Sequence, residues 1–147
     1  MMQIQTTRFG AVTIEPEDVL RFPAGIFGFE TCRHWVLMSD ADNDYLGWLQ
    51  STVQPEVALA VVSPRRFVPD YQVRILRPEL ASLELSGAQD AQVLVIVGQN
   101  DRTITLNLKA PLLIHLERRL GRQVVNNADV AIQHELIESR PPLRKSA

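Results

Sequence analysis

Short runs of apolar or alternating residues follow one another along most of the 147-residue chain, and Gly, Pro, Asn or Asp bounds nearly every run. Runs of this length predict β-strands, because successive side chains of a strand point to opposite faces. The expected extended segments are Gln3–Ile14 with a turn or bulge at Gly10, Val19–Phe22, His34–Met38, Tyr45–Gln50, Val57–Val62 and Tyr71–Leu76.

The clearest local unit is a predicted β-hairpin over residues 93–108. Val93–Val97 is continuously apolar, Gly98–Arg102 has the residues of a turn, and Thr103–Leu108 alternates. We expect Ile104, Leu106 and Leu108 on one face of the second strand and Thr103, Thr105 and Asn107 on the other.

Two further strands, Leu112–Leu116 and Gln123–Asn126, predict a second hairpin around Gly121. Pro16–Asp18 predicts a single helical turn, because acidic residues are favourable near a helix start. The segments 78–85 and 130–137 fit a helix or a strand equally well.

The pattern as a whole predicts an all-β protein: a compact antiparallel β-barrel-like domain of many short strands with at most short helical turns. Closure into a barrel removes exposed strand edges. We expect one domain over residues 1–138, since a chain of this length is most simply a single unit. Residues 139–147, which include Pro141 and Pro142, are expected to form a flexible C-terminal tail.

The charge balance argues against direct binding to nucleic acid. The chain has 15 Lys and Arg against 17 Asp and Glu, a formal net charge of −2, whereas phosphate binding needs a basic face. Such binding would use the segments Arg65–Phe67 and Arg118–Arg119. The alternative interpretation of both segments is ordinary solvated surface charge.

Cys32 is the only cysteine, so no internal disulfide can form, which fits a reducing compartment. No N-terminal signal-peptide pattern and no apolar run of about 20 residues is present. We therefore expect a cytoplasmic protein with no membrane contact.

Metal binding and catalysis find little support in the sequence. Asp40, Asp42 and Asp44 resemble the start of a calcium loop, but Tyr45 and Ser51 replace its glycine and its bidentate glutamate. Only two other histidines could join the pair Cys32 and His34 in a zinc site, namely His115 and His134. We expect no metal.

A hydrolase that uses Cys32 would need one of these histidines as its base. The pair Gly25 and Gly28 lacks the lysine and hydroxyl residue of a phosphate-binding loop, so turn flexibility among core aromatics is the simpler interpretation. We expect no enzyme activity and no cofactor.

Three motifs carry a family resemblance: Phe22-Pro-Ala-Gly-Ile-Phe-Gly-Phe-Glu30, Trp48-Leu-Gln-Ser51 and Asn107-Leu-Lys-Ala-Pro111. Thr7–Gly10, Phe67-x-Pro69-Asp70-Tyr71 and Gln123-Val124 extend them in order. In this ordered set, from about Ile4 to about Leu136, the chain resembles FliW, the flagellar assembly factor family.

The resemblance implies a cytoplasmic, non-enzymatic regulator with a β-barrel-like fold. FliW proteins bind flagellin and also bind CsrA, an RNA-binding repressor of flagellin translation. Flagellin occupies FliW until it is exported, after which free FliW binds CsrA and relieves repression. The alternative function is a small β-barrel that binds RNA or another polyanion directly. We expect the free protein to be a monomer.

The residues expected to contact partners are polar or aromatic positions inside these motifs: Phe27, Trp48, Gln50, Ser51, Asn107, Lys109 and Gln123. Large aromatic rings are enriched in binding hot spots. A structural role is the alternative for each residue, since buried polar groups must also pair internally.

Overall fold

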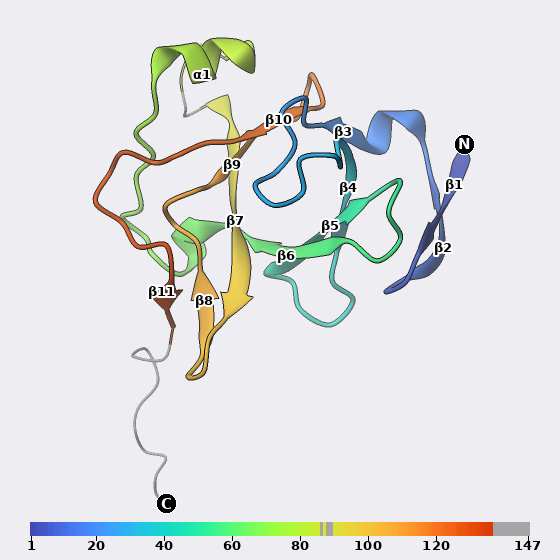
Figure 1. The fold of residues 1–147 in the computed structure, drawn as a ribbon, viewed down its shortest axis with the longest axis horizontal. Coiled ribbons are helices and arrows are strands. Elements are labelled where there is room, and N and C mark those ends of the chain that lie inside the picture. Colours follow the sequence, from blue (N-terminus) through green and yellow to red (C-terminus); the bar gives the residue numbers. More distant parts are fainter. Residues whose placement is uncertain (86, 88–89, 137–147) are drawn as a thin grey trace, which may run out of the picture.

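Seven strands close into a barrel in the computed structural model, which describes residues 1–85, 87 and 90–136 (Figure 1). The barrel strands are β3 (Val19–Arg21), β4 (His34–Ser39), β5 (Leu46–Ser51), β6 (Ala58–Val62), β7 (Gln92–Gln99), β9 (Leu112–His115) and β10 (Leu120–Gln123). They pair around the ring in the order β3, β4, β5, β6, β7, β9, β10. These pairs are antiparallel except for the one that closes the ring, where β10 runs parallel to β3.

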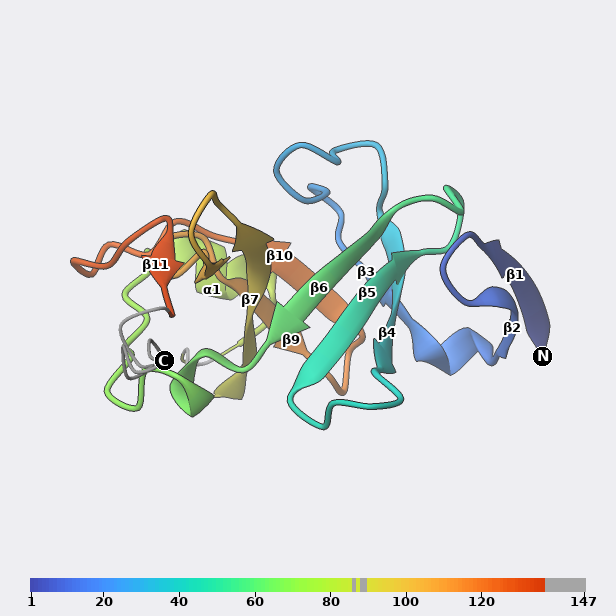
Figure 2. The ribbon, with the colours of Figure 1, turned by 90° about the horizontal axis from the view of Figure 1, so that it is seen from below.

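Four more strands lie beside the barrel. β8 (Ile104–Leu106) pairs with β7 and β11 (His134–Glu135) pairs with β8, which extends the sheet outward from the ring. β1 (Met2–Thr6) and β2 (Gly10–Ile14) form a separate hairpin at the other end of the molecule, next to β4 and β5 (Figure 2). The expected all-β, barrel-like fold is confirmed.

Helical structure in the described residues is limited to short pieces. η1 (Pro16–Asp18) is the predicted single turn, and η2 (Pro64–Arg66) is a second 3-10 turn. The ambiguous segment from Pro78 to Leu85 resolves into α1 (Arg77–Ser82), in which Pro78 lies in the first turn, where a missing N–H breaks no helical bond.

The main core is filled by large apolar side chains from the barrel strands and from the segment that follows β3. Phe22, Ile26 and Leu49 are fully buried there, as is Trp35. A second layer, with Leu83, Leu113 and Val124 among its members, packs between the end of α1 and the outside of β9 and β10. These clusters hold the strands and turns in place, and the candidate site lies on the surface outside them.

The predicted strand over Tyr71–Leu76 is wrong, because these residues run without strand pairing. Asn126 replaces a partner strand: its Oδ1 accepts from the Arg74 amide at 2.9 Å, and its Nδ2 donates to the Gln72 carbonyl at 2.9 Å. A side chain thus satisfies the backbone groups that a ladder would otherwise pair.

The predicted faces of Thr103–Leu108 are also partly wrong. Ile104 is 50% exposed, whereas Thr105 is buried, because β11 covers β8 and pairs Thr105 with Glu135. Leu106 and Leu108 are buried as expected.

The second predicted hairpin exists, but its second strand is β10 (Leu120–Gln123) and not the predicted Gln123–Asn126, and its turn is not at Gly121. The turn falls between β9 and β10, where Arg119 adopts the left-handed conformation with φ +55°, and Gly121 lies inside β10. In the ambiguous segment 130–137, residues 134–135 form β11, and Ile137 lies outside the described residues together with the predicted tail.

Candidate functional site

The first candidate surface is the Phe27 turn, defined as Gly25–Glu30, which follows β3. Gly25 and Gly28 have positive φ angles of 73° and 88°. A Cβ on Gly25 would stand 2.6 Å from the Glu30 backbone, so only glycine fits there. Ile26 is buried, while the Phe27 ring is 54% exposed. The turn therefore anchors one apolar residue in the core and presents the next to solvent.

Gln123 fastens this turn to the barrel. The Phe27 amide donates to Gln123 Oε1 at 2.7 Å, and Gln123 Nε2 donates to the Ala110 carbonyl at 3.0 Å. Gly28 donates to the Glu30 carboxylate at 3.0 Å, and this hydrogen bond is the main cause that lowers the pKa of Glu30. Gln123 is itself only 6% exposed, so it positions Phe27 from inside.

Asn107 and Lys109 shape the neighbouring loop. Asn107 Oδ1 accepts from the amides of Lys109 and Ala110 at 3.2 and 3.1 Å, which is a local turn of the kind that asparagine favours. Lys109 Nζ donates to the Ala128 carbonyl at 3.0 Å. Both side chains are half-buried. Through Ala110 and Gln123, this loop is connected to the Phe27 turn.

The second candidate surface is the Trp48 cluster, which consists of Arg8, Phe9, Asp40 and Trp48. Trp48 Nε1 donates to Asp40 Oδ1 at 2.9 Å. The Arg8 guanidinium stacks 4.0 Å from the indole centroid, and the Phe9 ring meets it edge-on at 6.1 Å. The Trp48 hydrogen bond is the main cause that lowers the pKa of Asp40, with the Asp42 amide second. The half-buried indole therefore joins the β1–β2 hairpin to β5.

Gln50 and Ser51 are buried at the end of β5. Ser51 Oγ accepts from the amides of Val53 and Gln54 at 3.2 and 3.0 Å. Gln50 Nε2 donates to the Ser51 carbonyl at 3.0 Å, while its Oε1 has no partner in the described part of the chain. Both side chains therefore make internal hydrogen bonds at the end of β5.

The structure thus separates the predicted residues into two surfaces. The first surface includes Phe27, Asn107, Lys109 and Gln123, which are connected by hydrogen bonds through the backbone of Ala110. Trp48 lies apart in its own cluster. The sequence does not predict that Trp48 contacts Arg8 and Asp40, which lie 40 and eight positions before it in the chain. Such pairing is a tertiary contact with no local pattern.

Comparison with known proteins decides the family. The model of the family described as FliW protein matches residues 3–136. The chain belongs to the FliW family.

Curated relatives agree. The chain is similar to the flagellar assembly factor FliW of Bdellovibrio bacteriovorus, with 34% identity over 92% of this chain and 79% of the relative. It is similar to the factor of the same name from Syntrophomonas wolfei, with 35% identity over 93% of this chain and 90% of the relative. A crystal structure of the flagellar assembly factor FliW superposes with a TM-score of 0.85 at 30% identity, covering 97% of this chain and 99% of the other.

The hydrolase alternative needs the Cys32 thiol within hydrogen-bond reach of a histidine. Cys32 is 1% exposed and packs in the main core, and no hydrogen bond connects it with a histidine among the described residues. Within residues 1–85, 87 and 90–136, no three His, Cys, Asp or Glu side chains are grouped to hold a metal ion. No helix in that part of the chain has the length and apolar character needed to cross a membrane.

Proposed function

We propose that this chain is a cytoplasmic flagellar assembly factor that binds flagellin. When free of flagellin, it binds CsrA and prevents this translational repressor from silencing flagellin synthesis. The proposed action is binding alone, with no catalytic step, no cofactor and no direct contact with nucleic acid. Membership of the FliW family over nearly the whole chain supports the proposal.

The observation that carries the binding proposal is the exposed Phe27 ring. A 54% exposed aromatic would ordinarily be mobile, but its backbone is held by Gln123 and by the flanking glycines. A pre-positioned aromatic ring loses little conformational freedom on binding, which favours affinity. We propose that Phe27 inserts into an apolar pocket of a partner.

The Trp48 cluster is proposed as the second contact. Its indole has one edge in a hydrogen bond to Asp40 and one face under Arg8, so the cluster presents a rigid surface that is partly aromatic and partly charged. Lys109 and Asn107 would contribute polar contacts beside Phe27. Gln50, Ser51 and Gln123 would act by holding these surfaces in place. A net charge of −2 suits a basic RNA-binding partner, because opposite charge speeds encounter.

The switch requires that flagellin and CsrA bind this chain in mutually unfavourable ways. This chain does not have to cover the RNA site of CsrA: it only has to bind more tightly to the form of CsrA that cannot bind RNA than to the form that can. A coupling of about 1–3 kcal/mol would give a five- to 150-fold change in affinity.

Calorimetric titration of the full chain with CsrA and with flagellin of the same organism, singly and in competition, tests the proposal. We expect saturable binding to each and displacement of CsrA by flagellin. Sedimentation should show a monomer before titration. If the folded protein bound neither partner but bound RNA with an affinity that fell steeply with salt, the direct RNA-binding alternative would replace this proposal.

A further inference from the structure

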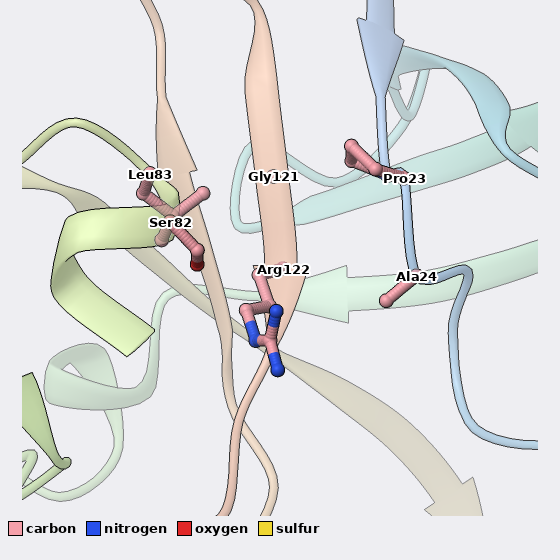
Figure 3. Close-up of a pocket in the computed structure, with 6 residues that line it drawn as sticks. All are labelled: Pro23, Ala24, Ser82, Leu83, Gly121 and Arg122. Atoms are coloured by element: carbon pink, nitrogen blue, oxygen red, sulfur yellow. The ribbon is translucent and has the colours of Figure 1, made fainter. Parts of the chain in front are cut away.

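A pocket of about 230 Å³ lies outside the barrel, between the end of α1, strand β10 and the segment that follows β3. It is lined by Pro23, Ala24, Ser82, Leu83, Gly121 and Arg122. Figure 3 shows the Arg122 head group standing in the space between Ser82 on one side and Ala24 on the other. Neither surface described above includes this pocket.

Arg122 is unusual for its position. The side chains two positions before and after it, Leu120 in β10 and Val124 just beyond the strand, are buried and pack in a cluster with Leu83. Arg122 takes the place between them, where an apolar residue would continue the pattern. Its Nε is buried and has no hydrogen-bond partner in the described part of the chain.

The acidic side chain of Glu84, just after α1, is engaged elsewhere. Glu84 pairs with Arg118 at 3.0 Å. Among the described residues, no ion pair includes Arg122. A buried N–H without an acceptor is costly, and the cost is larger for a charged group. The Nε itself is covered by protein, so an anion would approach the outer guanidinium nitrogens, which stand in the pocket (Figure 3), and gain charge complementarity and planar-fork donors there.

The walls determine what can carry that anion. Pro23 and Ala24 are exposed and supply apolar surface, and the Ser82 hydroxyl already donates to the Glu79 carbonyl at 2.7 Å. The pocket thus offers one cationic fork and a small apolar wall. We propose that it binds a short-chain carboxylate, whose oxygens accept from the Arg122 guanidinium while its alkyl group contacts Pro23 and Ala24. This site goes beyond the proposed function.

The test uses the full chain and sodium propionate as the probe. Side-chain Nε–H signals of arginine are followed by ¹H–¹⁵N NMR, and the Arg122 signal is assigned from Arg122→Gln. We expect a saturable shift of that signal, with a Kd on the order of 1 mM, as is reasonable for so small a ligand. Propionamide, which has the same shape without charge, and sodium chloride at equal ionic strength should not reproduce it.

Three comparisons separate carboxylate recognition from charge alone. Arg122→Gln should weaken binding at least about tenfold, since hydrogen bonds to charged groups are strong. Arg122→Lys keeps the charge but loses the fork and should also weaken it. Arg33→Gln, at an exposed arginine, should leave it unchanged. Inorganic phosphate should bind more weakly than propionate, because it lacks the alkyl group.

The proposal is overturned if the Arg122 signal shows no saturation, if all arginine signals shift together with ionic strength, or if phosphate equals propionate. The Arg122 signal is also assigned in the wild-type protein by through-bond correlation with its own backbone, so the wild-type spectrum decides these points even if Arg122→Gln fails to fold. Binding of flagellin and CsrA is measured separately, so failure here leaves the proposed function intact.

Discussion

The Phe27 amide donates a 2.7 Å hydrogen bond to the side-chain carbonyl of Gln123, a residue 96 positions later. The same side chain donates to the Ala110 carbonyl. One buried amide thus connects three of the motifs that are characteristic of the family: the aromatic turn, the Asn107–Pro111 segment and the start of Gln123-Val124. The exposure of Phe27 depends on a residue that no partner needs to touch.

Replacement of Gln123 by Ala should therefore destabilise the fold. Both the Phe27 amide and the Ala110 carbonyl would lose their partner, and each buried unpaired group costs about 1–3 kcal/mol. We expect a loss of about 2–4 kcal/mol in the free energy of unfolding, measured by urea titration. Gln133→Ala, at an exposed position, is the control and should change it by less than about 0.5 kcal/mol. Equal stability of the two variants would mean that the Gln123 bridge contributes nothing.

Phe27→Ala should separate binding from stability. The ring is 54% exposed, so its removal should change the free energy of unfolding by less than about 1 kcal/mol. On the proposed function, the same change should weaken partner affinity about 30-fold, the loss that corresponds to a hot spot of 2 kcal/mol. Val53→Ala removes another exposed apolar side chain, which is 63% exposed, and should leave affinity unchanged. Unaltered calorimetric affinity of Phe27→Ala for both partners would remove Phe27 from the interface.

Gly121 cannot accept a side chain while Phe22 keeps its place. A Cβ at Gly121 would lie 2.4 Å from the Phe22 ring. Gly121→Ala should therefore cost about 1–3 kcal/mol of stability by overpacking. Combining it with Phe22→Leu should cost less than the sum of the two single changes, because the smaller side chain gives up the occupied space. Additive effects in urea titrations of all four proteins would argue against the contact.

The Trp48 cluster should respond to acid. Its hydrogen bond to Asp40 lowers the pKa of that carboxyl from the ordinary value of 3.8. A lowered folded-state pKa stabilises the fold above the unfolded-state value, and this contribution is lost as pH falls through the folded-state value. Trp48→Phe should raise the Asp40 pKa toward 3.8, followed by NMR of the carboxyl carbon. As a control, the pKa of Glu135 should be the same in Trp48→Phe as in the unaltered protein, since Glu135 lies in a separate ion pair with Arg102.

The strand pattern predicted most of the barrel because its information is local. His34–Ser39, Leu46–Ser51 and Ala58–Val62 alternate or are continuously apolar and are bounded by turn residues, so their hydrophobic period was enough. A barrel was predicted, but the strands that close it were not. Ring closure depends on which non-neighbouring strands meet, and the parallel pairing of β10 with β3 rests on a single pair, Leu120 opposite Arg21.

The candidate site was predictable as a set of residues but not as a geometry. Gln50 and Asn107 stood out as polar positions within apolar strands, yet sequence cannot tell a partner contact from an internal hydrogen bond. Asn126, in contrast, has a structural role that the sequence did not indicate. It fixes the segment from Gln72 to Arg74 and supports Tyr71, although nothing in its local sequence distinguishes it from any turn asparagine.

The barrel closure also constrains how the chain can be made. β3 is synthesised early, but its second neighbour, β10, begins only at Leu120. During translation the nascent chain therefore has an open strand edge on β3 until residues 120–123 have left the ribosome, and such edges are prone to pair with other chains. Because long-range pairing slows folding, ring closure should be a late step of folding.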